Sequence, residues 1–145
     1  MDVLSIGLKG LAETLVTEEN TAAAMGSGLL PVFATPAMLA LMEKAAASSV
    51  QPFLSEGQGT VGTRLEVSHL AATPIGLTVR AESELIAVDR RKLRFSVRAW
   101  AGDELIGEGE HERFIIDNAR FLEKALAKRE LLQNTKTERK LPITT

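Results

Sequence analysis

Apolar and polar side chains alternate with a period of two through most of the second half of the chain. The first such run places Val61, Thr63, Leu65, Val67 and His69 on one predicted face, with charged and hydroxyl side chains between them, which is typical of a half-buried strand. Similar runs follow after short turns, and the pattern predicts strands over residues 61–71, 77–85, 93–99 and 104–116. Consecutive strands joined by short turns form an antiparallel meander.

The first half of the chain predicts one strand and one long helix. Residues 7–16 carry apolar side chains suited to a strand, and residues 21–30 are small and glycine-bearing, as in a short helix or a flexible flap. Thr35 and Pro36 mark a helix start, because threonine is a favourable N-cap and proline is favoured at the first helical position. The helix is expected to run through residues 37–50, with an apolar face at helical spacing.

These elements predict an α+β protein of order β-α-β-β-β-β, in which a curved antiparallel sheet wraps around one long central helix. A chain of 145 residues fits one domain. A final amphipathic helix is expected over residues 119–132. We therefore predict a single domain over residues 1–132, followed by a polar C-terminal tail over residues 133–145.

Charge and residue usage narrow the possible functions. The net charge of −2, from 17 basic and 19 acidic side chains, lacks the positive field by which most proteins bind nucleic acid. The sequence has no cysteine and only two histidines, His69 and His111, so no metal site is expected. Neither a secretory signal pattern nor an apolar run of about 20 residues is visible. We expect a cytoplasmic protein that binds neither nucleic acid nor membranes.

Several short motifs, in this order and at these spacings, resemble the fluoroacetyl-CoA thioesterase-like family. They are the stretch around Thr35, Glu43 eight residues later, the Val61-Gly62-Thr63 segment and the Val67-Ser68-His69 segment. The likeness covers about residues 10–116 and implies the hotdog fold. It also implies an acyl-CoA thioesterase in which Thr35, Glu43 and His69 form the catalytic set, with coenzyme A as part of the substrate and no other cofactor.

The substrate is expected to contact Gly62, Phe33 and Pro36 in such an enzyme. Phe33 is the only aromatic residue between positions 26 and 33, so a strongly aromatic lid over the acyl group is not evident. The sequence therefore favours an ordinary small acyl-CoA over fluoroacetyl-CoA itself. A non-catalytic protein that binds acyl-CoA or another small ligand is the alternative reading.

Thioester hydrolysis needs a nucleophile and donors for the developing oxyanion, while the thiol leaves readily with a pKa of about 8.5. Glu43 is expected to act as general base for water or as a nucleophile that forms an anhydride, and the sequence leaves both open. His69 would orient or protonate, and Thr35 would bond the carbonyl oxygen near the helix N-terminus, where backbone N–H groups suit an oxyanion.

The eight-residue spacing from Thr35 to Glu43 corresponds to about 12 Å along a helix, which is too far for both side chains to act on one carbonyl. The resemblance implies a dimer in which the helix end of one subunit meets the glutamate of the other. We therefore expect a homodimer, and the sequence leaves open whether two dimers pair further into a tetramer.

Each site residue also has a structural explanation. Thr35 is a competent N-cap, Glu43 a normal solvated helix residue and His69 a normal hydrogen-bonded core histidine. His111 reads as an ordinary strand residue that could line a channel near Arg113. The basic turn at residues 90–92 could meet the phosphates of coenzyme A, although such turns are usually only solvated.

Overall fold

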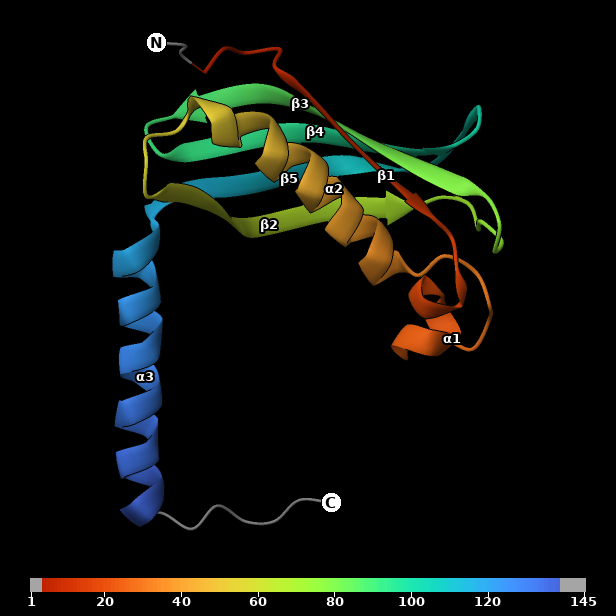
Figure 1. The fold of residues 1–145 in the computed structure, drawn as a ribbon. Helices are drawn as coiled ribbons and strands as arrows, with labels where there is room; N and C mark the ends of the chain where they lie inside the picture. The colour runs from red at the N-terminus through yellow and green to blue at the C-terminus, as the bar shows by residue number, and fades with distance from the viewer. Residues whose placement is uncertain (1–3, 139–145) are drawn as a thin grey trace.

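The computed structural model describes residues 4–138 (Figure 1). Its strands are β1 (Lys9–Leu15), β2 (Gln58–His69), β3 (Thr78–Asp89), β4 (Lys92–Ala101) and β5 (Glu104–Asp117). They form an antiparallel sheet in the order β1-β3-β4-β5-β2, so β1 and β2 are the two edges. The helices are α1 (Ala22–Met25), α2 (Thr35–Val50) and α3 (Asn118–Glu138), and two short 3₁₀ turns, η1 (Glu18–Asn20) and η2 (Gln51–Phe53), flank the first two.

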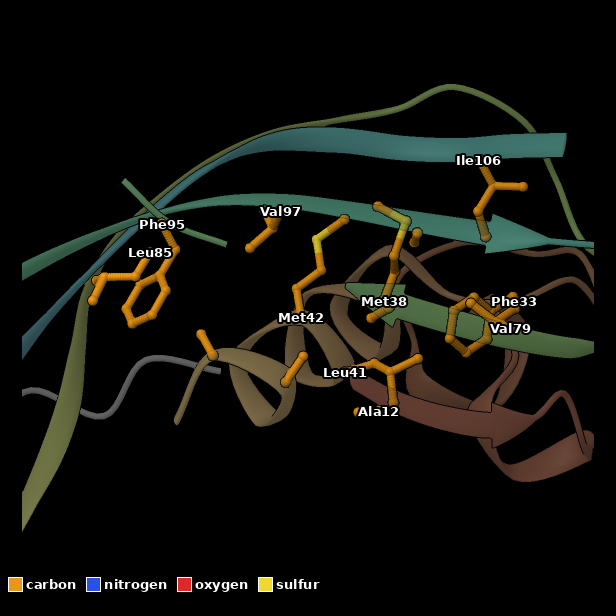
Figure 2. Close-up of a cluster of buried hydrophobic side chains, with 14 of the residues drawn as sticks. Ala12, Phe33, Met38, Leu41, Met42, Val79, Leu85, Phe95, Val97 and Ile106 are labelled. Carbon is orange, nitrogen blue, oxygen red and sulfur yellow. The ribbon is translucent and has the colours of Figure 1, made fainter. Parts of the chain in front are cut away.

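The long helix α2 lies across one face of the curved sheet and forms the core with it (Figures 1 and 2). Its buried side chains recur at helical spacing and pack against inward-facing residues of β3, β4 and β5. The largest fully buried members of this core are Phe33, Phe95, Met38, Met42, Leu85 and Leu93. The predicted hotdog architecture, one central helix against a curved antiparallel sheet, is confirmed.

The start of α2 differs from the prediction in one respect. Ala34, not Thr35, is the N-cap residue, and no side chain caps this helix end. Thr35 occupies the first helical position, with Pro36 directly after it. Because the hydroxyl of Thr35 is not used to cap the helix, it is available for another partner.

A β-bulge in β2 also corrects the predicted faces of this strand. The register with β5 shifts between Gly62 and Arg64, and such a bulge reverses the alternation of side chains. Gly62 pairs with the buried Arg113, whereas Val61 pairs with the exposed Phe114 on the opposite face. The prediction that Val61 and Thr63 share the face of His69 was therefore wrong, and Gly62 takes the inward position.

The C-terminal helix α3 is longer than the predicted helix over residues 119–132. Of the predicted tail over residues 133–145, residues 133–138 continue α3, and residues 139–145 lie outside the described part of the chain. Figure 1 shows α3 extending away from the sheet, past the β2 edge. Within residues 4–138, no helix combines the length and the apolar character needed to cross a membrane.

Candidate active site

Thr35 and His69 meet at the N-terminal end of α2. The Oγ1 atom of Thr35 lies 2.7 Å from Nδ1 of His69, the last residue of β2. The two residues are 34 positions apart in sequence, so the contact depends on the way α2 crosses the sheet. The hydroxyl and the imidazole thus form a hydrogen-bonded pair beside backbone N–H groups that have no intrahelical partner.

Burial sets the charge state of His69. Desolvation lowers its pKa from the ordinary value of 6.5, and the nearby backbone of Ala71 opposes this effect to a smaller extent. The ring is therefore neutral at neutral pH. Its Nε2 atom is buried and has no hydrogen-bond partner of ordinary geometry among the described residues. A neutral, partly buried imidazole can accept or deliver a proton when a substrate group reaches it.

A small pocket of about 330 Å³ adjoins this pair. Thr35 and His69 line it together with mainly apolar side chains, which include Val32, Phe33 and Ala71. Phe33 is almost fully buried and belongs to the core, so only a small part of it reaches the pocket. Pro36 is exposed in the first turn of α2 and is absent from the lining of this pocket.

Glu43 lies farther along α2 and makes contact with β5. Its Oε2 atom accepts a hydrogen bond of 3.0 Å from Nη1 of Arg113, which forms an ion pair. The Arg113 side chain is 9% exposed and the Glu43 side chain 40% exposed. Arg113 is fixed from the other side because its Nε and Nη2 atoms donate to the side chain and the carbonyl of Thr60. The carboxylate of Glu43 is thus held by an anchored cation while part of it faces solvent.

His111 completes this network from within the sheet. The carbonyl of Arg64 can only accept a hydrogen bond, so Nδ1 of His111, 2.8 Å away, must carry the proton. Its Nε2 atom then accepts from Nη1 of Arg113 at 3.2 Å. Desolvation lowers the pKa of His111, and the Arg64 carbonyl opposes this effect. A neutral His111 therefore orients the same guanidinium that holds Glu43.

Gly62 leaves the space in which the Glu43 carboxylate sits. A Cβ atom added to Gly62 would clash with Oε2 of Glu43 and would lie 3.2 Å from Nη1 of Arg113 and 3.3 Å from Cε1 of His111. The absence of a side chain at this position is what lets the carboxylate approach β2. The predicted site residue Gly62 thus lies at Glu43 and not at Thr35.

The structure brings the predicted catalytic residues together as two separate groups. Thr35 pairs with His69 at the start of α2, and Glu43 pairs with Arg113 two turns later on the same unbroken helix. At 1.5 Å per residue the separation along the axis is about 12 Å. Within one chain the two pairs therefore lie far apart along α2, as the sequence spacing predicted.

The sequence offered His111 only as a possible channel residue near Arg113, and it did not reveal that both belong to the network around Glu43. Both are buried on the inward face of β5, whereas the glutamates between and beside them, Glu110 and Glu112, point to the other face. Two inward-pointing ionisable residues in an alternating strand were the available signal. Among residues 4–138, no group of three histidine, aspartate or glutamate side chains is placed to hold a metal ion.

Comparison with known proteins gives consistent matches. The family model described as fluoroacetyl-CoA-specific thioesterase matches residues 16–119. The fluoroacetyl-CoA thioesterase of Streptantibioticus cattleyicolor is 46% identical over 90 residues, which are 62% of this chain and 65% of that protein. The aligned region thus spans about two thirds of that relative's length.

Solved structures match over a longer range. A threonine-to-serine variant of a fluoroacetyl-CoA thioesterase in complex with acetyl-CoA has a TM-score of 0.82 at 34% identity, covering 86% of this chain and 98% of that one. A Thermus thermophilus hypothetical protein described as a thioesterase superfamily member has a TM-score of 0.81 at 30% identity, covering 96% of this chain and 100% of that one.

Proposed function

Because the chain belongs to the fluoroacetyl-CoA-specific thioesterase family, we propose that it hydrolyses a small acyl-CoA thioester to the free acid and coenzyme A. The observation that carries the proposal is the pair of Thr35 and His69, 2.7 Å apart at the N-terminus of α2 and beside a small apolar pocket. The pocket suits a short acyl group, and the helix end suits the oxyanion formed when the thioester carbonyl is attacked.

Glu43 supplies the attacking group in this proposal. Its partly exposed carboxylate takes a proton from water, or itself attacks the carbonyl carbon to give an anhydride that water then opens. Either route releases the coenzyme A thiolate, which takes up the proton that the Glu43 carboxylate accepted from water or a proton from solvent, while the neutral His69 orients the Thr35 hydroxyl through their hydrogen bond. Arg113 fixes the carboxylate in one position, which favours attack along a defined direction.

We propose that a homodimer assembles the complete site. β2 is an edge strand of 12 residues, and an edge of this length offers a row of unpaired backbone groups to another strand. Two β2 strands paired antiparallel about a two-fold axis place the His69 end of one strand beside the Gln58 end of the other. The Glu43 carboxylate, which faces β2, then faces the second copy's Thr35 and His69.

The helix α3 supports the same arrangement. It extends past the β2 edge (Figure 1), and every side chain from position 118 to position 134 is exposed in the single chain. These side chains include Leu122, Leu126, Leu131 and Leu132, with exposed fractions from 42% to 69%. Because exposed apolar patches on soluble proteins mark interaction surfaces, α3 is expected to pack against the second copy.

The activity is tested by thiol release from a panel of acyl-CoAs of increasing chain length. The wild type is compared with Glu43→Gln and with Glu110→Gln, a matched control on the outer face of the sheet. We expect Glu43→Gln to lower kcat by about 10²–10⁴-fold, as for loss of a general base, and Glu110→Gln to have no effect. Binding of acyl-CoA without turnover in the wild type would instead identify a non-catalytic binding protein.

The shared site is tested by mixing two inactive variants. Thr35→Val and Glu43→Gln subunits are unfolded together and refolded, so that about half of the dimers are mixed. In a site built from two subunits, each mixed dimer has one intact site, and the mixture recovers about a quarter of wild-type activity. If each chain builds its own site, every site carries a defect and the mixture stays inactive.

A further inference from the structure

A second groove lies at the other end of β2 from His69, where α3 begins. Its volume is about 390 Å³, and it is lined by Gln58, Arg91, Ile116, Asp117, Arg120, Phe121 and Lys124. The residues come from three separate places: the start of β2, the turn between β3 and β4, and the junction of β5 with α3. The groove is therefore a product of the tertiary structure.

Three cations line this groove without an ion-pair partner. Arg91, Arg120 and Lys124 are all exposed, and none of them forms a salt bridge with another described residue. The neighbouring Lys92, in contrast, pairs with Glu112 at 3.3 Å. Of the basic turn at residues 90–92, Arg91 is the member that lines the groove.

The carboxylate in the groove already has a partner. Asp117 Oδ1 accepts a hydrogen bond of 3.1 Å from the backbone N–H of Arg120, in the first turn of α3. Three cations against one carboxylate leave the groove positive in a protein whose net charge is −2. Such a site attracts an anion with several negative charges, because charge-assisted hydrogen bonds to phosphate are strong and directional.

The groove also has an apolar wall beside the cations. Phe121 is 46% exposed, and Ile116 also lines the groove. An aromatic face next to arginines is suited to a purine ring, which stacks on such surfaces. Phosphates and a purine together describe the nucleotide end of coenzyme A, which carries an adenine, a pyrophosphate and a 3′-phosphate.

The position of the groove fits the length of such a substrate. Gln58 lines the groove, and Gly62, four residues along β2, faces the Glu43 carboxylate. Four residues of strand span about 13 Å, a distance that an extended pantetheine arm can bridge. In the proposed dimer, the groove of one subunit lies at the same end as the second copy's Thr35 and His69.

We infer that this groove binds the phosphorylated nucleotide end of the coenzyme A substrate, through Arg91, Arg120 and Lys124 for the phosphates and Phe121 for the adenine. The inference rests on the proposed thioesterase function and adds to it a binding site away from the reacting atoms. It predicts that the nucleotide contributes to substrate affinity. It also predicts that replacing these cations weakens the binding only of substrates that carry the nucleotide.

The test compares two substrates with the same acyl group, acyl-CoA and acyl-pantetheine, which lacks the nucleotide. In the Arg120→Glu/Lys124→Glu variant we expect KM for acyl-CoA to rise about tenfold or more, which corresponds to about 1.4 kcal/mol. The ratio of kcat/KM for acyl-CoA to that for acyl-pantetheine falls by the same factor. Arg129→Glu, on the same helix but absent from the groove lining, is the matched control and keeps the wild-type ratio.

Salt gives an independent readout. Raising the ionic strength screens exposed charges, so KM for acyl-CoA rises with salt in the wild type and becomes much less salt-dependent in the double variant. An unchanged substrate ratio in the double variant would overturn the inference. If the wild type hydrolyses neither substrate, the proposed function fails instead, and calorimetric binding of free coenzyme A to wild type and double variant then decides whether the groove binds nucleotide.

Discussion

Replacing Gly62 with alanine is expected to lower the thioesterase activity about 10²-fold while leaving the protein folded. The added methyl group would lie well inside 3.0 Å of Oε2 of Glu43, whereas ordinary contacts begin at 3.4 Å. Arg113 cannot move away, because two hydrogen bonds to Thr60 and one to His111 hold its guanidinium. The Glu43 carboxylate must therefore retreat by about 1 Å and lose its hydrogen bond to Arg113.

The expected effects on rate and stability differ in size. A misplacement of about 1 Å in a reacting group costs about 10²-fold in rate. The cost in folding free energy is about 1 kcal/mol or less, because the Glu43 side chain is 40% exposed and can rotate into solvent. Such a change lowers the melting temperature by only a few degrees in a domain of this size.

The assay is kcat/KM for the best acyl-CoA substrate, measured together with thermal unfolding, for Gly62→Ala, Glu43→Gln and the double variant. If the methyl group acts through Glu43, the double variant is no less active than Glu43→Gln alone, since one interaction is removed twice. A Gly62→Ala enzyme with wild-type kcat/KM would refute the reasoning. Losses that multiply in the double variant would show that Gly62 acts on another part of the site.

Three further predictions follow from the same geometry. Gly10→Ala places a methyl group against the carbonyl of Ala45, where β1 meets α2. We therefore expect the free energy of unfolding to fall by about 1–3 kcal/mol, which is measured as a lower midpoint of urea unfolding, while the activity of the folded fraction stays unchanged. Burial lowers the pKa of His111 from 6.5, so below pH 6.5 the unfolded chain binds a proton at this residue more readily than the folded chain does. The free energy of unfolding therefore falls as the pH drops below 6.5. In denaturation curves measured from pH 7.5 to 5, His111→Gln should make the free energy of unfolding less dependent on pH. Thr35→Ser keeps the hydroxyl that contacts His69 and should retain most of the activity. Thr35→Val removes the hydroxyl and should lower kcat by about 10²–10³-fold. Equal activity of the two variants would exclude a role for the hydroxyl.

The sequence determined the order of elements and the family. Period-two alternation marked the strands of the meander, and the Thr35-Pro36 pair marked the start of α2 to within one residue. These signals are local, because side-chain periodicity and helix-start preferences act over a few neighbouring residues. The spacing of Thr35 and Glu43 even indicated that the two side chains lie apart within one chain, since an unbroken helix fixes the distance between them.

Only the tertiary structure decided which side chains meet. A bulge between Gly62 and Arg64 reversed the face of β2, and no periodic pattern in a single strand reveals where a partner strand forces such a shift. The network of Glu43, Arg113 and His111 joins residues up to 70 positions apart. The sequence therefore determined the identity and local placement of Thr35, Glu43 and His69, and the packing of α2 against β2 and β5 decided their partners, because contacts between distant segments depend on how whole elements cross.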